Sequence, residues 1–566
     1  FVGTIILDKG KRVFMADDRK VNIPFSVPQE TTPDYKVLVK LVSWTNKKEL
    51  PKAEILQVIG KKGDNNSEMH SIILDRGFSP NFPEEVEKEA ENIKKHSEEN
   101  FEKEIKNRRD MRNTLTFTID PHDAKDFDDA ISYRRLPNGN LEVGVHIADV
   151  SHYVRPKTEL DKEAQKRATS IYLVDRTIPM LPEILSNDLC SLKPNEDKLT
   201  FSAIFEMDTN GVVHKHWFGK TVINSNHRFT YESAQESIVG KNELYKEELQ
   251  TLNKIAKIML AKRSEKGAIS FEQDEVKFVL DENGKPLRVI RKVRFDAHKL
   301  IEEFMLLANR EVARHINKIH KPQNKNDRPL FLYRIHDVPD YEKIAELSIF
   351  VKALGHELPL KDGHVTGRDL NALFKRLEGK AEEGIVKTAA IRSMAKAIYS
   401  IKNIGHYGLA FDYYTHFTSP IRRYPDTLVH RLLEHYLAGK TIGTQEFAFY
   451  EKMGSHSTEM EIKAADAERE SIKLKQVEFM KDKIGQTFDG VISGVTEWGM
   501  YIEEKETKSE GLIRLRDMKD DYYRLEPKKY CLIGEKNKKK YQLGDKVRFK
   551  INAADLDRKT LDFQLV

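Results

Sequence analysis

The stretch "TIDPHDAKDFDDAI", residues 118–131, places five carboxylates within ten residues, from Asp120 to Asp129. Their mutual repulsion costs stability unless a positive charge lies among them. The run 114–119 alternates polar and apolar residues, as a strand does, and Pro121 cannot continue the hydrogen-bonding ladder of a strand. We therefore expect the acidic residues in a loop that leaves a strand, where four of them converge on one point: Asp120, Asp126, Asp128 and Asp129.

Three interpretations of this loop compete. An EF-hand calcium loop needs Gly at its sixth position and Glu at its twelfth, but counting from Asp126 places Ile131 and Pro137 there, which excludes it. A solvated acidic loop is the simple alternative, since such loops are common. The third is a catalytic metal site for phosphoryl transfer, because hard oxygen ligands at this density suit Mg²⁺ or Mn²⁺.

Length and composition narrow the class of protein. The 566 residues suffice for three or four domains of about 100 to 200 residues each. Lys and Arg total 95 against 90 Asp and Glu, so the net charge of +5 does not by itself indicate a nucleic-acid partner. Cys190 and Cys531 lie far apart without metal-ligand spacing, which argues against a disulfide framework or a zinc site and favours a reducing cytoplasm.

The sequence contains no run near the roughly 18 apolar residues of a membrane span and no charged-then-apolar leader. We therefore expect no membrane partner, and we expect a monomer. The chain begins with Phe1 rather than Met, inside a strand-like run, so we also expect a fragment that lacks its N-terminal part.

Periodicity divides the chain into four segments. Short β-like runs broken by Gly, Pro and Asp predict a small antiparallel barrel over 1–80, and similar runs predict a second over 484–566. Between them lie a charged connecting helix, 81–110, and a mixed α/β region, 111–483, that ends in a long helix from Met453 to Lys483. The predicted fold class is therefore α+β and multidomain, with two small OB-type barrels flanking one large catalytic domain.

Both barrels mix aromatic and basic residues, as expected of a surface that stacks bases and contacts phosphates of single-stranded RNA. In the first barrel these residues are Phe14, Tyr35, Trp44, Lys40, Lys47 and Lys48. In the second they are Phe488, Trp498, Tyr501, Arg514, Arg516, Lys546 and Arg548. The alternative is that these aromatics belong to the hydrophobic cores, because aromatic residues dominate small cores.

Arg422 and Arg423 follow "TSP", where Ser419 can cap a helix and Pro420 can open one. The sequence therefore predicts both arginines in a first helical turn, where a cation opposes the helix dipole by about 0.3 to 1 kcal/mol. An anion should compensate, and a scissile phosphate held by guanidinium is a good candidate. A local ion pair with Asp426 is the other candidate, which can occupy one arginine but hardly both.

His146, Asp149 and His152 have residue types that suit a transition metal. In one strand, however, the two histidines lie about 20 Å apart at roughly 3.3 Å per residue, and Asp149 points to the other face. We therefore interpret all three as structural.

The chain also resembles the ribonuclease II/R family. "DPHDAKDFDDA", "VGVHIADVSHYV", "IEEFMLLAN", "HYGLAFDYYTHFTSPIRRYPD" and "AERE" occur in that family's order, and the resemblance covers essentially the whole chain. It implies a cold-shock-like barrel first, an RNB-type catalytic domain and an S1-like barrel last. It further implies an enzyme that processively hydrolyses single-stranded RNA from the 3′ end to nucleoside 5′-monophosphates with Mg²⁺, acts in RNA turnover and enters structured RNA.

By motif, the resemblance assigns metal-binding and catalytic roles to the four aspartates already named and leaves Asp123 out. It places one catalytic arginine at Arg422 or Arg423, without deciding between them. It also places an aromatic that stacks on the terminal nucleotide at Tyr172 and a glutamate near the terminal ribose at Glu468. Without the family, a core tyrosine and an exposed helix glutamate are the simpler interpretations.

Two rival functions belong to other classes. A catalytically silent RNA-binding or translation-regulating protein on the same fold is disfavoured because all four essential aspartates are present. A DNA nuclease shares the two-metal chemistry but not these motifs, so no DNA partner is expected. Sensitivity to the 2′-hydroxyl of the sugar would separate it from an RNA enzyme.

Overall fold

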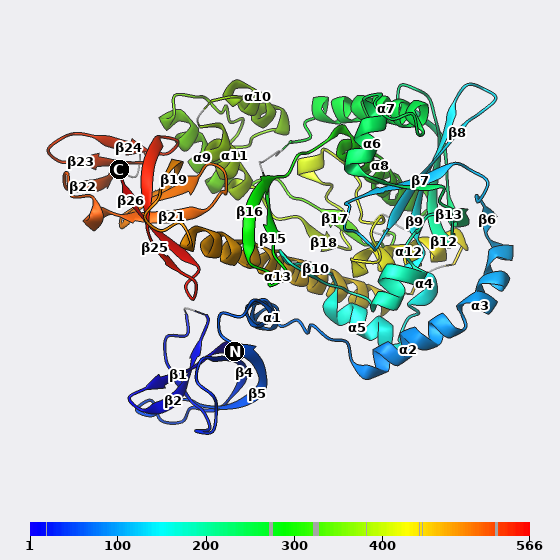
Figure 1. The fold of residues 1–566 in the computed structure, drawn as a ribbon. Helices are drawn as coiled ribbons and strands as arrows, with labels where there is room; N and C mark the ends of the chain where they lie inside the picture. Colours follow the sequence, from blue (N-terminus) through cyan, green and yellow to red (C-terminus); the bar gives the residue numbers. More distant parts are fainter. Residues whose placement is uncertain are drawn as a thin grey trace.

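The computed structural model describes residues 1–18, 20–270, 275–320, 328–380, 382–440, 442–443, 445–526 and 530–566. A barrel near each end of the chain flanks one large central domain, and the long helix α13 (Gln445–Lys481) runs from the central domain to the C-terminal barrel (Figure 1). The predicted α+β architecture with two small barrels is confirmed. Helix α13 begins eight residues before the predicted Met453.

The N-terminal barrel closes in the strand order β1-β2-β3-β5-β4. Its strands are β1 (Val2–Asp8), β2 (Lys11–Ala16), β3 (Phe25–Ser26), β4 (Tyr35–Ser43) and β5 (Lys52–Lys61). Phe14 is fully buried, with its ring centre 5.5 Å from that of Phe25, so Phe14 belongs to the core and cannot stack on RNA. Trp44, beyond the end of β4, is 45% exposed. Helix α1 (Asn65–Asp75) packs against β4 and β5.

The predicted connecting helix, 81–110, is two helices and a short strand. Helices α2 (Glu84–Lys95) and α3 (Ser97–Glu104) are separated at His96, and β6 (Arg109–Asp110) then joins the central sheet. The segment is also less solvated than its charge suggests, because Val86 and Ala90 of α2 are buried in the core of the central domain.

A seven-stranded mixed sheet forms the centre of the large domain, in the order β14-β7-β8-β9-β12-β13-β6. The strands other than β6 are β7 (Thr116–Asp120), β8 (Asp129–Arg135), β9 (Leu141–Ala148), β12 (Asp197–Met207), β13 (Val213–Asn224) and β14 (His227–Thr230). Strand β7 ends at Asp120 and its neighbour β8 begins at Asp129, so the acidic residues occupy the loop between two paired strands. The prediction that this loop leaves a strand is confirmed.

Helices cover the sheet and complete the core. They include α4 (Val150–Tyr153), α5 (Glu159–Arg167), α6 (Tyr231–Ile238), α7 (Lys246–Glu265), α8 (Asp296–Ile319) and α12 (Tyr424–Leu437). Helix α8 buries Leu300, Phe304 and Val312 at the spacing read from the sequence, which confirms that helix. Three two-stranded sheets lie beside them: β10 (Ile171–Tyr172) with β11 (Thr177–Ile178), β15 (Val276–Leu280) with β16 (Pro286–Arg291), and β17 (Tyr333–Ile335) with β18 (Ile398–Ser400).

The C-terminal barrel closes in the order β19-β20-β21-β26-β25 and carries a three-stranded sheet, β22-β23-β24, that the sequence did not predict. The strands are β19 (Thr487–Thr496), β20 (Gly499–Glu504), β21 (Glu510–Arg514), β22 (Tyr523–Glu526), β23 (Cys531–Gly534), β24 (Lys540–Gln542), β25 (Lys546–Asp555) and β26 (Thr560–Leu565). Helices α9 (Tyr341–Ala353), α10 (Gly367–Leu377) and α11 (Glu383–Ser393) have a core of their own, which the C-terminal barrel joins where the rings of Phe350 and Tyr530 meet at 4.8 Å.

His146 and Asp149 have structural partners, in agreement with their interpretation. The two ring nitrogens of His146 lie 2.7 and 2.8 Å from the hydroxyls of Ser202 and Ser132. The fully buried Asp149 accepts hydrogen bonds from Arg108 at 2.8 Å and Lys220 at 2.6 Å. Burial alone would raise the pKa of Asp149, but Lys220 and Arg108 hold it well below its usual range. Within the described ranges, no helix has the length and apolarity needed to cross a bilayer.

We expect Asp149→Asn to lower the stability of the central domain by about 3 kcal/mol, because it removes the buried carboxylate shared by Arg108 and Lys220, which then keep the more exposed Glu104 and Glu434 as partners. The exposed Glu243→Gln, which removes only a surface charge, should be neutral. Thermal denaturation of both variants beside the wild type checks this. Equal melting temperatures for Asp149→Asn and Glu243→Gln would contradict the structural role.

Candidate active site

The aspartate loop (residues 120–129) meets a second segment, the turn 419–423, that lies almost 300 residues further along the chain. Asp128, only 5% exposed, accepts a hydrogen bond on Oδ1 from the backbone N–H of Ile421 at 2.8 Å. Its Oδ2 lies 3.7 Å from Nε of Arg422. The fold therefore brings Asp128 of the loop within ion-pairing distance of the Arg422 guanidinium group.

Burial and crowding hold the pKa values of these carboxyls high. Burial raises the pKa of Asp128 and of Asp129, although Arg422 opposes the shift in both. Burial also raises the pKa of Asp120, and the neighbouring charge of Asp129 raises it further. Burial raises the pKa of Asp126 too, although the charge of Arg422 and a hydrogen bond from the Tyr172 hydroxyl both lower it. Because desolvation and like charge both disfavour ionisation, one arginine does not neutralise the loop.

The donor set fits a hard divalent cation. The four side chains supply carboxylate oxygens only, and Oδ2 of Asp120 is buried without a hydrogen-bond partner. Among the described residues, however, no three His, Cys, Asp or Glu side chains already stand as a set that could hold a metal ion. The predicted convergence on one point is thus not preformed, because one oxygen of Asp128 is engaged by Ile421 and the other faces Arg422.

The two arginines have different environments, and neither lies within a helix. Helix α12 begins at Tyr424, with Arg423 as its extended N-cap residue, so the prediction of both in a first helical turn is wrong. The physical reason is that Pro425, not Pro420, occupies the first turn, where proline is favoured. Arg423 is paired with Asp426 through Nε at 2.9 Å and a second nitrogen at 2.8 Å.

Arg422 is the arginine that faces the loop. Its guanidinium donates to the hydroxyl of Ser419 at 3.0 Å, and its side chain remains 41% exposed. Asp426, which holds Arg423, also accepts the backbone N–H of Ser419 at 2.8 Å and is fully buried. Asp426 therefore fixes both ends of the turn from which Ile421 and Arg422 approach Asp128.

Tyr172 and Glu468 lie on elements that pack together. Strand β10, which ends at Tyr172, packs against α13, and Tyr172 is 37% exposed while its hydroxyl hydrogen-bonds to Asp126. On α13, the hydroxyl of Ser471 accepts the backbone N–H of Val174 at 3.2 Å and donates to the carbonyl of Glu468 at 2.7 Å. An exposed aromatic face beside the carboxylates argues against the core interpretation of Tyr172.

Two further residues, Arg228 and Tyr231, border the loop and were missed in the sequence. Arg228 of β14 donates to the carbonyls of Pro121 and His122. Tyr231 follows β14 and stacks on His298 of α8, with ring centres 3.7 Å apart and planes within 9°. Parallel pairing of β14 with β7, which sets Thr230 opposite Asp120, brings them there, and no local pattern signals that pairing.

The aromatics predicted for the C-terminal barrel separate into two places. Trp498, 57% exposed, donates its indole N–H to the hydroxyl of Tyr501 at 3.3 Å. Arg514 lies opposite Gly499, next to that pair. Phe488 lies near the other end of β19, against Phe549 of the core at 6.2 Å. The structure thus brings Trp498 and Tyr501 together and leaves Phe488 apart from them.

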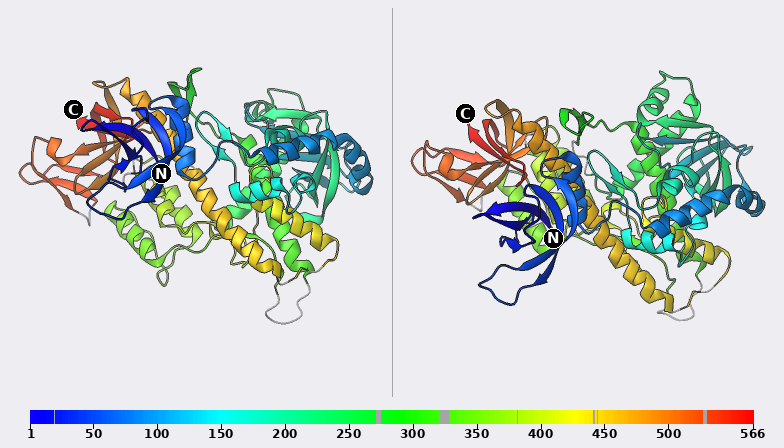
Figure 2. Two further views of the ribbon diagram at one scale, coloured as in Figure 1. Left: turned by 90° about the horizontal axis from the view of Figure 1, so that it is seen from below. Right: turned by 60° about the horizontal axis from the view of Figure 1, so that its bottom comes forward.

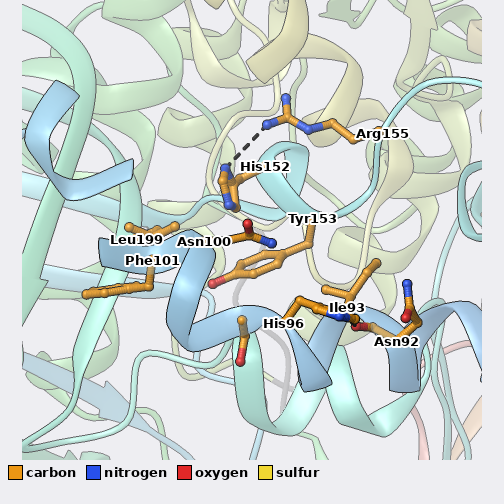
Figure 3. A pocket seen from close by; sticks show the side chains of 10 residues that line it. Asn92, Ile93, His96, Asn100, Phe101, His152, Tyr153, Arg155 and Leu199 are labelled. Atoms are coloured by element: carbon orange, nitrogen blue, oxygen red, sulfur yellow. Dashed lines mark hydrogen bonds between the residues drawn. The ribbon is translucent and has the colours of Figure 1, made fainter. Parts of the chain in front are cut away.

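A pocket lies away from these residues, where the elbow between α2 and α3 faces α4 (Figure 3). Its lining includes His96, Asn100, His152 and Arg155, with Arg155 donating to Nδ1 of His152 at 3.4 Å. None of the predicted site residues contributes to its lining.

Comparison with known proteins identifies the class. An RNB domain matches residues 108–439, a cold shock domain 14–83 and an S1 RNA binding domain 481–565. Ribonuclease R of Aquifex aeolicus is 38% identical over 537 residues, covering 94% of this chain and 74% of that protein. Mycoplasma genitalium RNase R, solved in complex with ribose methylated single-stranded RNA, superposes with a TM-score of 0.91 at 28% identity, covering 100% of this chain and 89% of that one.

Yeast Ssd1, described as a pseudonuclease, superposes with a TM-score of 0.74 at 20% identity, covering 94% of this chain and 67% of that one. At that identity the match concerns the fold alone. The family model and the relatives decide the class: the chain belongs to the ribonuclease II/R family of RNB-domain 3′→5′ exoribonucleases. Within that family, curated relatives that are 33 to 38% identical over nearly the whole chain are named ribonuclease R, and enzymes of this class generally depend on a divalent metal ion.

We expect the two arginines to differ on substitution by lysine. Arg422→Lys should lower kcat roughly 100-fold with little change in melting temperature, because a lysine cannot reproduce the fork of donors that faces the carboxylates. Arg423→Lys should instead lower stability by about 1 to 3 kcal/mol, because Asp426 loses a paired hydrogen bond. Single-turnover kinetics and thermal denaturation of both variants check this. If Arg423→Lys instead lowered kcat and Arg422→Lys lowered the melting temperature, Arg423 would be the arginine that acts in catalysis.

Burial of the aspartates and the repulsion among them should lower the stability of the metal-free protein. A carboxyl whose folded pKa is raised destabilises the fold progressively as pH rises from the usual carboxyl range through that raised value. In EDTA at neutral pH, Asp120→Asn should therefore raise the melting temperature, whereas Mg²⁺ should raise that of the wild type more than that of the variant. Asp123, which is exposed and ion-paired with Lys277 at 3.1 Å, supplies the contrast within the same loop: Asp123→Asn should leave the melting temperature in EDTA unchanged or slightly lower. A melting temperature in EDTA that is lower for Asp120→Asn than for the wild type would contradict the claim that ionised Asp120 destabilises the metal-free fold.

Proposed function

We propose that the chain hydrolyses single-stranded RNA processively from its 3′ end, releasing nucleoside 5′-monophosphates, in RNA turnover that includes structured RNA. The observation that carries this proposal is the meeting of the aspartate loop with Arg422, since a phosphodiester bound there faces clustered carboxylates on one side and a partly exposed guanidinium on the other. Domains of the cold-shock and S1 types on the same chain support RNA as the substrate.

Each residue has a distinct role in this proposal. A divalent ion, Mg²⁺ or Mn²⁺, held by Asp120, Asp126, Asp128 and Asp129, supplies Lewis-acid activation of the attacking water and of the leaving oxygen when bound. Arg422 neutralises the non-bridging phosphate oxygens as negative charge accumulates on them. Arg423 acts only through Asp426, as the anchor of the turn 419–423.

The terminal nucleotide is held by its base and its sugar. The exposed face of Tyr172 stacks on the last base, and Glu468 accepts a hydrogen bond from a terminal ribose hydroxyl. Further from the 3′ end, Trp498 and Tyr501 supply a stacking surface on the C-terminal barrel, beside Arg514. Phe488 contributes to that barrel mainly through its contact with Phe549.

The rival of a catalytically silent RNA-binding protein uses the same architecture, as the match to a pseudonuclease illustrates. The proposal for an active enzyme therefore rests on residues and not on the fold. All four aspartates, the arginine that faces them and the exposed tyrosine are present together. We further propose that the protein acts as a monomer in the cytoplasm, in keeping with Cys190 and Cys531, which are both buried and form no disulfide bond.

We expect Asp128→Asn to abolish hydrolysis while leaving RNA binding largely intact. An amide keeps the size of the side chain and can still accept the N–H of Ile421, but it removes a charge from the metal site. Affinity comes mostly from phosphate and base contacts spread along the bound strand. End-labelled RNA and DNA oligomers, incubated with Mg²⁺ or with EDTA, give the turnover and the identity of the mononucleotide released. Turnover by Asp128→Asn within tenfold of the wild type would contradict the metal-site assignment.

A further inference from the structure

The hairpin of β15 and β16 stands out beside the long helix and the central domain, where it is drawn in green (Figure 2). Its register pairs Lys277 with Ile290 and Val279 with Arg288. Paired residues share a face of an antiparallel sheet, so these four side chains form one face, which we call the outer face. The opposite face carries Phe278 and Val289.

The opposite face anchors the hairpin. Phe278 is 4% exposed, and its ring lies 6.1 Å from that of Phe479 on α13. At the tip, Lys285 forms an ion pair of 2.7 Å with Asp482, and Gly284 lies against Asn65 at the start of α1. The hairpin is therefore held along its length and at its tip.

Three of the four residues of the outer face are exposed while Val279 is half-buried, and the face begins at the aspartate loop. Lys277 forms an ion pair of 3.1 Å with Asp123, the one carboxylate of the motif to which no role was assigned. Ile290 is 40% exposed, and Arg288 is exposed with no ion pair among the described residues. From Lys277 the strand extends about 10 Å towards its tip at roughly 3.3 Å per residue, and the tip contacts α1 beside the N-terminal barrel.

An exposed isoleucine flanked by cations is a poor solvent-facing surface but a suitable one for a single nucleic-acid strand. A guanidinium group can hold a phosphate, and an apolar side chain can contact the sugar and the face of a base. A folded acidic protein would also match the charge. Continuity with the aspartate loop, whose proposed substrate is itself a polyanionic strand, favours RNA over a protein partner.

We propose that the outer face of the β15–β16 hairpin binds the RNA substrate upstream of the nucleotide being removed, with Arg288 on a phosphate and Ile290 against a sugar or base. The Asp123–Lys277 ion pair docks this face beside the catalytic carboxylates. The inference rests on the proposed function, and it gives Asp123 a positioning role outside the metal site. It makes the hairpin one wall of the path between the aspartate loop and the N-terminal barrel.

The test compares Arg288→Gln with Arg314→Gln, which removes a similarly exposed arginine from the far part of α8. Affinity for a long fluorescent oligoadenylate is measured over a range of salt concentrations, in EDTA and in the Asp128→Asn background. For Arg288→Gln the slope of log affinity against log salt should become shallower by about 0.7, the value for one phosphate contact on a single strand. Arg288→Lys should retain the wild-type slope, and Arg314→Gln should match the wild type.

A second measurement locates the contact. RNA carrying 4-thiouridine at successive distances from its 3′ end is irradiated in the complex, and the crosslinked peptide is identified by mass spectrometry. Crosslinks to β16 from upstream positions, and not from the last nucleotide, support the inference. A slope for Arg288→Gln equal to that of Arg314→Gln, or crosslinks that avoid the hairpin at every position, would overturn it. If the wild type fails to degrade RNA, the proposed function fails instead, which is a separate result.

Discussion

The buried contact between Asp128 and the turn 419–423 is the interaction on which the site depends. One oxygen of Asp128 receives the N–H of Ile421, and the other faces Arg422. A carboxylate that is almost fully buried is unfavourable without such donors, so the contact ties the central sheet to the segment before α12. Asp426 is satisfied in a similar way, because it accepts hydrogen bonds from the backbone N–H of Ser419 and from the guanidinium group of Arg423.

Crowding of the four carboxylates lowers the stability of the metal-free protein and, for the same reason, favours the binding of a cation. The pKa values of all four carboxyl groups are raised, so their ionisation at neutral pH destabilises the metal-free fold. A cation that binds them removes this repulsion and so stabilises the folded protein. Arg422 reduces the repulsion among the carboxylates without neutralising them. The remaining negative charge can attract a cation, and the guanidinium group can attract an anionic substrate. Residues beside the loop, such as Arg228, restrain its backbone through hydrogen bonds to carbonyl groups.

Local patterns predicted much of the architecture and the loop, and long-range pairing accounts for most of what they missed. The alternation before Asp120, the spacing of α8 and the short runs of both barrels are properties of neighbouring residues, and each was confirmed. Arg422 and Arg423 look identical in sequence, but their partners lie in different segments, so only the fold distinguishes them. The positions of Phe14 and Tyr231 likewise depend on what packs against them.

Helix α13 has a mechanical consequence. Its 37 residues extend about 55 Å at roughly 1.5 Å per residue, and along that length it contacts α1, β10, β16 and strands of the C-terminal barrel (Figure 1). The C-terminal barrel and the strand that carries Tyr172 therefore both pack against one continuous helix. Moving the barrel relative to β10 would require this helix to bend or to slide against its neighbours, so the fold keeps the two at a nearly constant separation.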